Sequence, residues 1–404
     1  MAKEGLSVLV FTHRVPFLQN SGYAIVAYNT IKGLVEEGHH VTVISLNADN
    51  SLLKKLTDPL LEKVTFKTFP ISPQATPRNF VRALLADNLF TNERFFSATA
   101  DRSLAAELKA GRYDIIHLEG LPVTTYLETI RKNSKAKVIY RSHTTEHQVW
   151  KRMAKQIRNP LRKWYLMRFA RKMERFETEH INHFDGVAAI TDFDRNIFEE
   201  LGCTAPIAVL PAAVNMDKYK PEPSRTETGS LFFLGSLDWL PNREGLEWFL
   251  ENFHEEITNG ELRSKLYVAG HDVPEEFDRY ENNREIFIVG EVDSALEFIN
   301  NKSIMVVPLL SGGGMRIKII EGMAMGKCII STSIGAEGIQ YEDGKHLFIA
   351  NTKEEFHEAI KRCLNDEKLC RTTGKNARDL VSAQHDYRKL AVKLSAFYNA
   401  VLTA

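Results

Sequence analysis

The sequence has few cysteines, no long apolar run and no net charge, and each feature argues against a class of protein. Its 404 residues include only Cys203, Cys328, Cys363 and Cys370, which lie far apart and form no C-x-x-C pair. This spacing argues against a disulfide framework and a structural zinc site, and it suits a reducing compartment. No apolar run approaches the roughly 18 residues that predict a membrane span. The formal net charge of zero indicates no general attraction to nucleic acid.

The order of the apolar segments is typical of an α/β protein with more than one domain. A chain of 404 residues is long for a single hydrophobic core. Short apolar runs rich in β-branched residues alternate with helical patterns, which predicts parallel sheets covered by helices on both faces. The N-terminal residues MAKEGLSVLVFTH are expected to form the first strand rather than a signal peptide.

A break in this alternation divides the chain into two such units. Residues 211–230 contain three prolines and few apolar residues, a composition typical of a linker. We therefore expect an N-terminal domain at 1–213, a C-terminal domain at 214–385 and a last helix at 386–404. The predicted architecture is two doubly wound, Rossmann-like domains facing across a cleft, with ligands outside the carboxyl ends of the strands.

One loop-to-helix junction in the second unit carries the pattern of an anion site. The segment SGGGMRIKIIEGMAMGKCIIS follows the predicted strand 303–310, and its helix is expected to begin near Met315. Glycines let a ligand approach the backbone, and the N–H groups at a helix N-terminus favour anions. Because Arg316 and Lys318 add positive charge, this junction predicts a diphosphate site.

The same helix carries a carboxylate and further glycines. Glu321 lies three residues after Lys318, on the same face, where it could accept hydrogen bonds from sugar hydroxyls such as a ribose diol. The segment GMAMGKC does not fit the Walker A pattern, and a Rossmann G-x-G-x-x-G is also absent here. For Gly322 and Gly326 we favour close packing of the helix on its sheet rather than ligand binding.

The chain resembles the retaining GT-B glycosyltransferases of family four. The similarity is strongest in GGGMRIKIIEGMAMGKCIISTSIGAEGI, which is similar to the donor-sugar region of that family. It extends in order along most of the chain, through FTHRVPFLQNSGYAIVAYNTIKGLVEEGHHVTVIS, FDGVAAITDFDRNIFEELG, IAVLPAAVNMDKYKP and FFLGSLDWLPNREGLEWF. The resemblance implies a metal-independent enzyme whose first domain binds the acceptor and whose second binds a nucleotide sugar. It also implies that the last helix packs back toward the first domain.

The resemblance also implies roles for individual residues. Glu321 matches the second glutamate of the family's E-x7-E motif, which holds the nucleotide ribose. Arg316 and Lys318 match cations that face the diphosphate, and Gly22 matches the glycine that lets the backbone approach the donor phosphates. The predicted donor-binding set is Gly22, Gly235, Gly313, Gly314, Arg316, Lys318 and Glu321.

The sequence departs from the family pattern at several of these places. Gly313 replaces the first glutamate of E-x7-E, which removes one expected contact to the donor sugar. Ser236, after the glycine that ends the first strand of the donor domain, replaces a basic residue, and Arg243 is a candidate substitute. The first of the paired glycines in the N-terminal loop is Ser21. These losses shift more of the diphosphate charge onto Arg316 and Lys318.

The segment RSHTTEHQVWKRM has two interpretations. Read literally, His143, Glu146 and His147 form an H-x-x-E-H pattern, which could mark a hydrolytic zinc site. However, His143 ends a predicted strand and Thr144 or Thr145 suits a helix N-cap, so the two histidines would not share a helical turn. The segment also resembles the family's H-N-x-E segment, which implies that His143 bonds a sugar hydroxyl or the transferring centre. His13, Arg14, Glu119 and Gly120 occupy other carboxyl-end positions and are weaker candidates.

A basic segment at 151–175 suggests contact with a membrane surface. It contains ten lysines and arginines but only one acidic residue, Glu174, and Asn159-Pro160 is expected to break it into two helices. Such a segment can bind anionic lipid, which would bring a lipid-linked acceptor to the enzyme. Helices whose charged face is solvated and whose apolar residues pack on the sheet explain the pattern equally well. Nucleic acid is not expected, because no recognition motif is present.

The predicted function is that of a cytoplasmic hexosyltransferase, peripheral on the inner face of the membrane. It would move a sugar from a nucleotide-diphosphate sugar to a glycan or lipid-linked acceptor of a surface polysaccharide or glycolipid, with His143 as its catalytic residue and no cofactor or metal. The alternatives are a non-catalytic sugar-nucleotide binding protein, a GT-B epimerase acting on a UDP-sugar, and the H-x-x-E-H zinc hydrolase.

Overall fold

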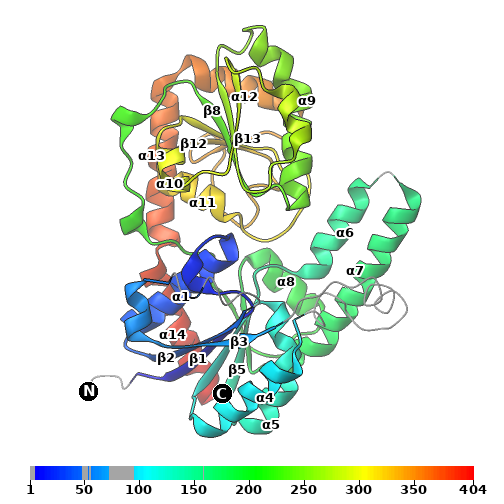
Figure 1. The fold of residues 1–404 in the computed structure, drawn as a ribbon, viewed down its shortest axis with the longest axis vertical. Coiled ribbons are helices and arrows are strands. Elements are labelled where there is room, and N and C mark those ends of the chain that lie inside the picture. The colour runs from blue at the N-terminus through cyan, green and yellow to red at the C-terminus, as the bar shows by residue number, and fades with distance from the viewer. Residues whose placement is uncertain (1–4, 48–52, 54–55, 72–94, 158) are drawn as a thin grey trace. The chain divides into compact units, whose positions relative to one another are not determined.

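The chain folds into two compact units, and each is built around a parallel sheet (Figure 1). The computed structural model describes residues 5–47, 53, 56–71, 95–157 and 159–404. One unit comprises Met1–Ala213 with Tyr387–Ala404, and the other comprises Val214–Asp386. The predicted fold class of two Rossmann-like domains is confirmed.

The first unit contains, among its described residues, a seven-stranded sheet of order β3-β2-β1-β4-β5-β6-β7. All neighbouring strands are parallel. The strands are β1 (Ser7–Thr12), β2 (His40–Asn47), β3 (Thr65–Pro70), β4 (Ile115–Glu119), β5 (Lys137–Arg141), β6 (Gly186–Ala189) and β7 (Ile207–Val209). The helices are α1 (Gly22–Glu36), α4 (Ala98–Ala110), α5 (Leu127–Asn133), α6 (Glu146–Gln156), α7 (Pro160–His180), α8 (Asp192–Glu200) and α14 (Tyr387–Thr403).

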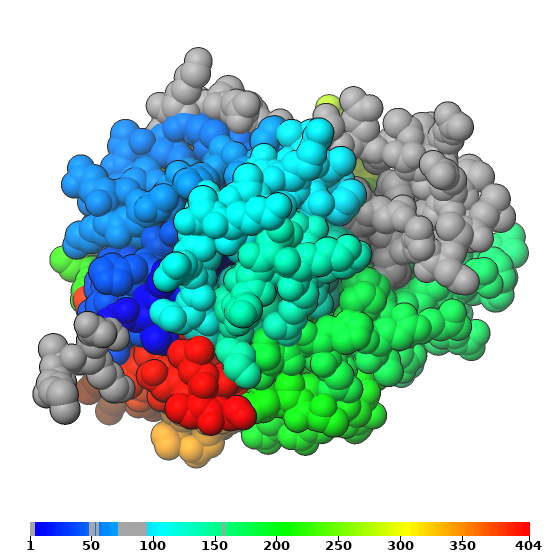
Figure 2. Space-filling view, turned by 90° about the horizontal axis from the view of Figure 1, so that it is seen from below, coloured from blue at the N-terminus to red at the C-terminus, as the bar shows by residue number. Residues whose placement is uncertain are grey.

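The last helix, α14, belongs to the first unit and covers one face of its sheet together with α1. Its residues Leu390, Leu394 and Val401 are buried at the spacing of one helical face. A Cβ atom added at Gly33 of α1 would lie 2.6 Å from Cβ of Ala391, so the two helices are in close contact. In Figure 2 the C-terminal residues, in red, lie beside green residues and below blue and cyan ones.

The second unit contains, among its described residues, a six-stranded parallel sheet of order β10-β9-β8-β11-β12-β13. Its strands are β8 (Leu231–Leu234), β9 (Leu266–Ala269), β10 (Ile286–Gly290), β11 (Ile304–Val307), β12 (Cys328–Ser331) and β13 (Phe348–Ile349). Its helices are α9 (Leu240–Thr258), α10 (Ala295–Asn300), α11 (Ile317–Ala324), α12 (Lys353–Asn365) and α13 (Glu367–Gln384).

Short 3-10 helices connect several of these elements. They are Pro16–Leu18, Pro59–Lys63, Leu121–Tyr126, Ile181–His183, Met216–Lys218, Pro223–Arg225 and Glu275–Tyr280. In the part of the chain that the structure describes, none of the helices combines the length and apolar character needed to span a bilayer.

Candidate functional site

Lys318 lies at the carboxyl end of the second sheet, on the first turn of α11. Its Nζ donates a hydrogen bond of 2.8 Å to Oδ1 of Asn242 and lies 4.6 Å from the ring centre of Phe233 at the end of β8. Among the described residues, no carboxylate forms an ion pair with it. Burial, and then the positive charge of Arg316, lower the pKa of Lys318 to about 7. A bound anion would therefore be stabilised here and would raise that pKa.

Gly235 follows β8 and leaves the space that the Lys318 ammonium occupies. A Cβ atom added there would lie 2.8 Å from Nδ2 of Asn242 and 3.2 Å from Nζ of Lys318. Asn242 also donates a hydrogen bond of 2.8 Å to the carbonyl of Ser236. The site thus places a cation, fixed by Asn242, next to a partly exposed glycine at the end of a strand, and a cation in this position favours an anionic ligand.

Arg316 holds the glycine loop that precedes α11. Its guanidinium donates to the carbonyl of Gly313 and lies 4.8 Å from the ring centre of Trp239. The expected start of the helix near Met315 is wrong by two residues, because α11 begins at Ile317 with Arg316 at its N-cap. The predicted contact of Arg316 with a diphosphate stays a prediction, since its guanidinium here binds the loop.

The position of the Arg316 guanidinium also explains why residue 312 of the loop is a glycine. Gly312 has a φ of +114°, and a Cβ atom there would lie 2.6 Å from Nη2 of Arg316. Gly314 has a φ of +73°, a left-handed conformation that side chains disfavour. The conformation of this loop therefore depends on glycine at two of its three positions.

Glu321 lies one turn further along α11 and is held by the segment that enters the second unit. Its Oε1 accepts a hydrogen bond of 2.9 Å from the Tyr219 hydroxyl, and the Tyr219 carbonyl accepts one of 2.8 Å from Arg378. Burial raises the pKa of Glu321 to about 7, against the opposing effect of the Tyr219 hydrogen bond. The carboxylate is thus fixed in place, and its second oxygen can accept a ligand hydroxyl.

Two expectations about nearby residues need correction or qualification. A Cβ atom at Gly322 would lie 2.8 Å from Sδ of Met305, which confirms close packing of α11 on the sheet. Gly326 does not serve close packing of this kind. Its φ is +65°, which marks a left-handed residue after the helix, and the nearest atoms to an added Cβ are 3.7 Å away. Arg243, the candidate substitute for a lost cation, instead pairs with Glu276 at 2.5 Å.

His143 lies at the carboxyl end of the first sheet, just after β5. Its Nε2 is 2.7 Å from Oε1 of Glu119, a buried residue at the end of the neighbouring strand β4. Its ring lies 4.8 Å from that of Tyr23, whose hydroxyl donates to the Glu119 carbonyl at 2.8 Å. His13, a weaker candidate, lies against Tyr23 as well, with ring centres 4.1 Å apart. The structure therefore brings three of the carboxyl-end positions into one cluster.

Gly22 is the first residue of α1 and is exposed. Ser21 is the N-cap, and its hydroxyl accepts a hydrogen bond of 3.3 Å from the backbone of Ala24. Gly22 therefore lies at a helix N-terminus after β1, where the backbone dipoles favour a negative charge. Its assignment to donor phosphates stays a prediction.

The zinc interpretation of the H-x-x-E-H segment is wrong. His147 is buried, and its Nδ1 lies 2.6 Å from Oε2 of Glu177, whereas His143 bonds Glu119. Helix α6 begins at Glu146, so His143 precedes it. Across the described residues, the ligand atoms of this segment do not converge on a common point. Thr145 occupies the N-cap position, but its hydroxyl donates to Asp194 instead of capping the helix.

A different set of residues, missed in the sequence because of its spacing, does converge. Cys328, Cys363 and Cys370 bring their sulfur atoms within 4.8 Å of one another in the core of the second unit. Hydrogen bonds with the other two thiols, together with burial, raise the pKa of Cys328 well above its usual range. The same hydrogen bonds lower the pKa of Cys370 to about 4, and all three side chains pack among the apolar residues of that core.

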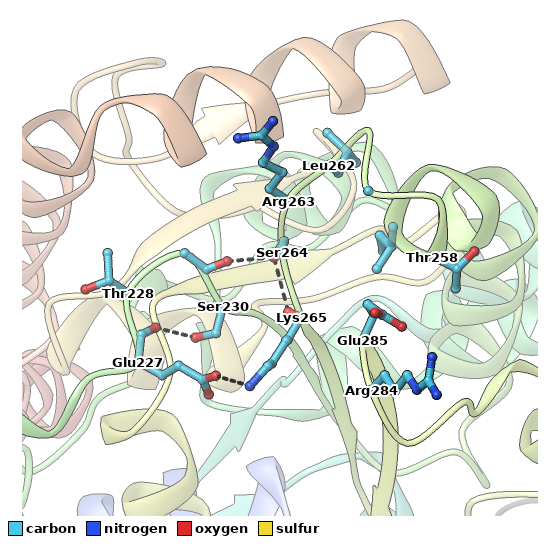
Figure 3. Close-up of a pocket in the computed structure, with 13 residues that line it drawn as sticks. Glu227, Thr228, Ser230, Thr258, Leu262, Arg263, Ser264, Lys265, Arg284 and Glu285 are labelled. Atoms are coloured by element: carbon cyan, nitrogen blue, oxygen red, sulfur yellow. Dashed lines mark hydrogen bonds and ion pairs between the residues drawn. The ribbon is translucent and has the colours of Figure 1, made fainter.

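A surface pocket of about 390 Å³ is lined by none of the candidate site residues described above (Figure 3). It is lined by residues 227–230, 257–258, 260, 262–265 and 284–285, which come shortly before β8, β9 and β10 in the chain. Its charges partly cancel, since Lys265 pairs with Glu227 at 3.2 Å. Ligands of such sheets bind at the opposite, carboxyl ends of the strands, so this pocket does not identify the site.

Comparison with known proteins places this architecture among the GT-B glycosyltransferases. The chain is similar to the solved structure of Anabaena Alr3699/HepE in complex with UDP and glucose, with a TM-score of 0.69 and 14% identity over 98% of this chain and 99% of the other. It is also similar to sucrose-phosphate synthase (tll1590) from Thermosynechococcus elongatus, with a TM-score of 0.73 and 16% identity over 98% and 99%. These likenesses define the fold.

Sequence families identify the class of enzyme. Residues 20–218 match the family model described as Glycosyltransferase Family 4, and residues 228–366 match the model described as Glycosyl transferases group 1. An uncharacterised 44.6 kDa protein in the cps region of Klebsiella pneumoniae is 22% identical over 397 residues, which are 95% of this chain and 97% of that protein. The chain belongs to the group 1 glycosyltransferases of family four and is a glycosyltransferase, as predicted.

Proposed function

We propose that this glycosyltransferase takes a hexose from a nucleotide-diphosphate sugar and transfers it, with retention of configuration, to a glycan or lipid-linked acceptor. The bond between the anomeric carbon and the diphosphate breaks with its electron pair on the diphosphate, the oxygen of the acceptor hydroxyl bonds to that carbon, and the hydroxyl proton passes to the leaving diphosphate. The main task of the protein is to stabilise the charge of the leaving diphosphate and to align the acceptor.

The observation that carries this proposal is the environment of Lys318. Its ammonium is partly buried beside Gly235, is held by Asn242, and has no carboxylate partner among the residues that the structure describes. Placing a cation in a low-dielectric site without a counterion is costly, and its lowered pKa reflects that cost. A diphosphate supplies the missing counterion. No metal is needed in this proposal, because Lys318 and the N-terminus of α11 supply the positive potential.

The remaining candidate residues take roles that fit their positions. Glu321 accepts hydrogen bonds from the ribose diol, and Gly313 and Gly314 let the loop backbone approach the donor. In the N-terminal unit, Gly22 approaches the donor phosphates through its backbone, and His143 bonds a hydroxyl of the transferring sugar.

Two relatives support the choice of ligand class and pathway. The Anabaena HepE structures contain UDP, UDP with glucose, and UDP-glucose, so uridine nucleotides are the first ligands to test. The Klebsiella relative is named for a cps region, which favours assembly of a surface polysaccharide. A cytoplasmic location follows from this proposal, since nucleotide sugars are made there.

A thermal-shift panel of nucleotide sugars tests the ligand class. A donor present at about 100 times its dissociation constant stabilises the protein by about 2.7 kcal/mol, which raises the melting temperature by a few degrees. We expect one family of nucleotide diphosphate sugars to do this, and the corresponding nucleoside to fail. A panel in which no nucleotide sugar shifts the transition would refute the proposal.

The donor identified by the panel then separates transfer from its alternatives. A transferase hydrolyses its donor slowly without acceptor and faster with acceptor glycans. A UDP-sugar epimerase would instead accumulate a second sugar without any acceptor, and a binding protein would leave the donor intact.

We also propose that the acceptor is lipid-linked and that the α6–α7 hairpin contacts the membrane. Asn159 caps α7 and Pro160 starts it, which confirms the predicted break in the basic segment. The two helices lie side by side (Figure 1). Leu161 and Trp164, at the start of α7, are 77% and 63% exposed. The described exposed cations of the hairpin are Lys155, Arg162, Lys163, Arg168, Arg171 and Arg175, and Arg158 lies outside the described residues.

Exposed apolar side chains among cations match the chemistry of an anionic lipid surface, where an indole ring inserts between headgroups. Sedimentation with vesicles containing anionic lipid at low salt tests this contact. Trp164→Ser should reduce binding, whereas Val392→Ser, which removes a 54% exposed apolar residue from α14, should not. Equal sedimentation of both variants with wild type, or no sedimentation at all, would reject the hairpin as a membrane contact.

A further inference from the structure

A chain of hydrogen bonds joins His143 to the C-terminal helix through the interior of the first unit. Oε1 of Glu119 lies 2.7 Å from Nε2 of His143, and Oε2 lies 2.7 Å from Nε2 of His117. Nδ1 of His117 in turn lies 2.7 Å from the hydroxyl of Tyr398 on α14. We call these four residues the Glu119 network. His117, Glu119 and Tyr398 have no solvent exposure, so the bonds are not shared with bulk water.

The register of the sheet explains how these groups meet. His117 and Glu119 are two residues apart on β4 and therefore point to the same face. Glu119 is directly opposite Arg141 on the parallel strand β5, and His143 follows two residues later. Arg141 is 1% exposed, and its positive charge balances that of the carboxylate. Both oxygens of the Glu119 carboxylate accept hydrogen bonds, which stabilises this buried charge. The Arg141 guanidinium donates from Nη2 to the Pro211 carbonyl, whereas among the described residues its Nε and Nη1 have no hydrogen-bond partner.

The chemistry of the carboxylate determines which nitrogen of each histidine carries a proton. Burial alone would raise the pKa of Glu119, but the hydrogen bonds from His117 and His143 outweigh it and hold that pKa well below the usual range. An ionised carboxylate only accepts hydrogen bonds, so both histidines donate through Nε2. Burial and the charge of Glu119 raise the pKa of Tyr398 well above its usual value, so its hydroxyl keeps the proton that it donates to Nδ1 of His117.

Because Nε2 of His143 carries the proton, Nδ1 is the ring nitrogen that can accept a hydrogen bond. Its side chain is 19% exposed, and among the described residues no hydrogen-bond partner lies near Nδ1. The ring is also held by Tyr23, with 4.8 Å between ring centres. A histidine held in this way presents one nitrogen in a constant direction.

We propose that Glu119 is a positioning residue that fixes His143 in the Nε2–H form, so that Nδ1 accepts a hydroxyl hydrogen of the bound sugar. His117 and Tyr398 hold the carboxylate in place, which makes the C-terminal helix part of the support of the active site. The inference deepens the proposed function and rests on the role of His143 in it. Carboxylates that orient metal-ligating histidines change activity by about 10- to 100-fold when they are replaced, and we expect an effect at the lower end of this range here.

Nitrogen-15 NMR of the histidines in the full chain tests the network without any ligand. We expect His143 and His117 to show the Nε2–H form, with assignments taken from His143→Ala and His117→Gln. In Glu119→Gln the amide oxygen can accept from only one imidazole while the amide nitrogen donates to the other. At least one histidine should therefore change tautomer. An Nδ1–H form of His143 in the wild-type protein would overturn the proposal.

Kinetics with the identified donor and acceptor test the consequence. Glu119→Gln should lower kcat by about tenfold with little change in donor KM, and Tyr398→Phe should lower it less. The matched control is Glu177→Gln, which alters the other buried histidine–glutamate pair, His147 with Glu177 at 2.6 Å, and should leave kcat unchanged. An unchanged kcat in Glu119→Gln, or an equal loss in the control, would reject the positioning role.

A separate variant distinguishes failure of this inference from failure of the proposed function. If His143→Ala transfers sugar at the wild-type rate, the role of His143 in the reaction is wrong, whatever the tautomers show. If His143→Ala is impaired and Glu119→Gln is not, His143 keeps its role and the inference about Glu119 fails.

Discussion

The carboxyl ends of the two sheets differ in how their charges are balanced. In the N-terminal unit, Glu119 is hydrogen-bonded by His117 and His143 and lies beside Arg141, so its negative charge is balanced by a buried cation. In the C-terminal unit, Lys318 is held by a neutral amide, and burial together with the positive charge of Arg316 lowers its pKa. The charges at the carboxyl end of the N-terminal sheet balance one another, whereas the carboxyl end of the C-terminal sheet carries an excess of positive charge.

This difference indicates what each end can bind. A balanced network presents directed hydrogen-bonding groups and suits a neutral ligand such as a sugar hydroxyl. An unbalanced cation suits an anion, and its affinity for one increases because the site is partly removed from water. The same contrast predicts that variants of the first end change the rate of transfer, whereas variants of the second change affinity for the nucleotide.

The largest effect is expected from His143→Ala. Loss of the hydrogen bond from His143 to the transferring sugar should lower kcat by about 100-fold, because a polar group left without its partner in a site removed from water costs up to about 3 kcal/mol. Binding of the free nucleotide, measured by calorimetry, should remain at the wild-type value, since the nucleotide carries no sugar. If His143→Ala lost as much nucleotide affinity as it lost rate, the carboxyl ends of the two sheets would not differ in function in the way proposed.

Lys318→Met should mainly weaken nucleotide binding. Removing a cation that contacts phosphate costs about 1.5–3 kcal/mol, or about 10- to 100-fold in affinity, and Lys318→Arg should recover part of it. The matched control is Lys327→Met. Lys327 is also buried with a lowered pKa of about 8, but it precedes β12 at the amino end of the sheet and donates to the Asn300 carbonyl at 2.8 Å. Equal losses in both lysine variants would show that the effect is one of stability.

The fold could be predicted from the sequence because strand and helix periodicities are local. The positions of His143 and of the glycine loop followed from where the predicted strands end. The partners of these residues did not follow, because they come from distant segments. Asn242 lies on α9, 76 residues before Lys318, and no pattern in the sequence connects them.

The zinc alternative fails for the reason that the predicted strand and helix boundaries indicated. His143 ends a strand and His147 lies on the following helix, so they bond Glu119 and Glu177 instead. The three clustered cysteines are far apart in the sequence and converge through packing of β12, α12 and α13. Spacing alone predicts contacts only within one element, and sheet order is needed for the rest.

A smaller effect is expected from Glu321→Ala. The carboxylate is proposed to accept the ribose diol, so its loss should weaken nucleotide binding by about tenfold. The corresponding 2′,3′-dideoxy nucleotide should bind wild type and variant equally well. Glu256→Gln is the control, because Glu256 pairs with Lys353 and His357 away from α11. A dideoxy ligand that still distinguishes Glu321→Ala from wild type would contradict contact with the ribose.

The smallest effect is a dependence of donor affinity on pH, and its sign separates the two titrating groups of the C-terminal site. Lys318 has a pKa of about 7, so its charged fraction falls about fivefold from pH 7 to 8, and affinity for the diphosphate should fall with it. Glu321 also has a pKa of about 7 and becomes ionised over the same range, which favours ribose hydroxyls and opposes this fall. The phosphates of a nucleotide sugar are diesters and do not titrate near pH 7.

Two variants resolve these opposing contributions. Lys318→Arg keeps its charge at every pH in the range, so its affinity should be constant or should rise with pH through Glu321. Glu321→Gln removes the ionisation that opposes the fall, so the donor affinity of this variant should decrease with pH more steeply than that of wild type. Calorimetry of an intact nucleotide sugar at pH 6 to 9, in buffers of different ionisation enthalpy, measures both the affinity and the proton uptake. If donor affinity changed with pH to the same extent in wild type and Lys318→Arg, Lys318 would not contact the diphosphate. The unpaired positive charge of Lys318 would then need another explanation.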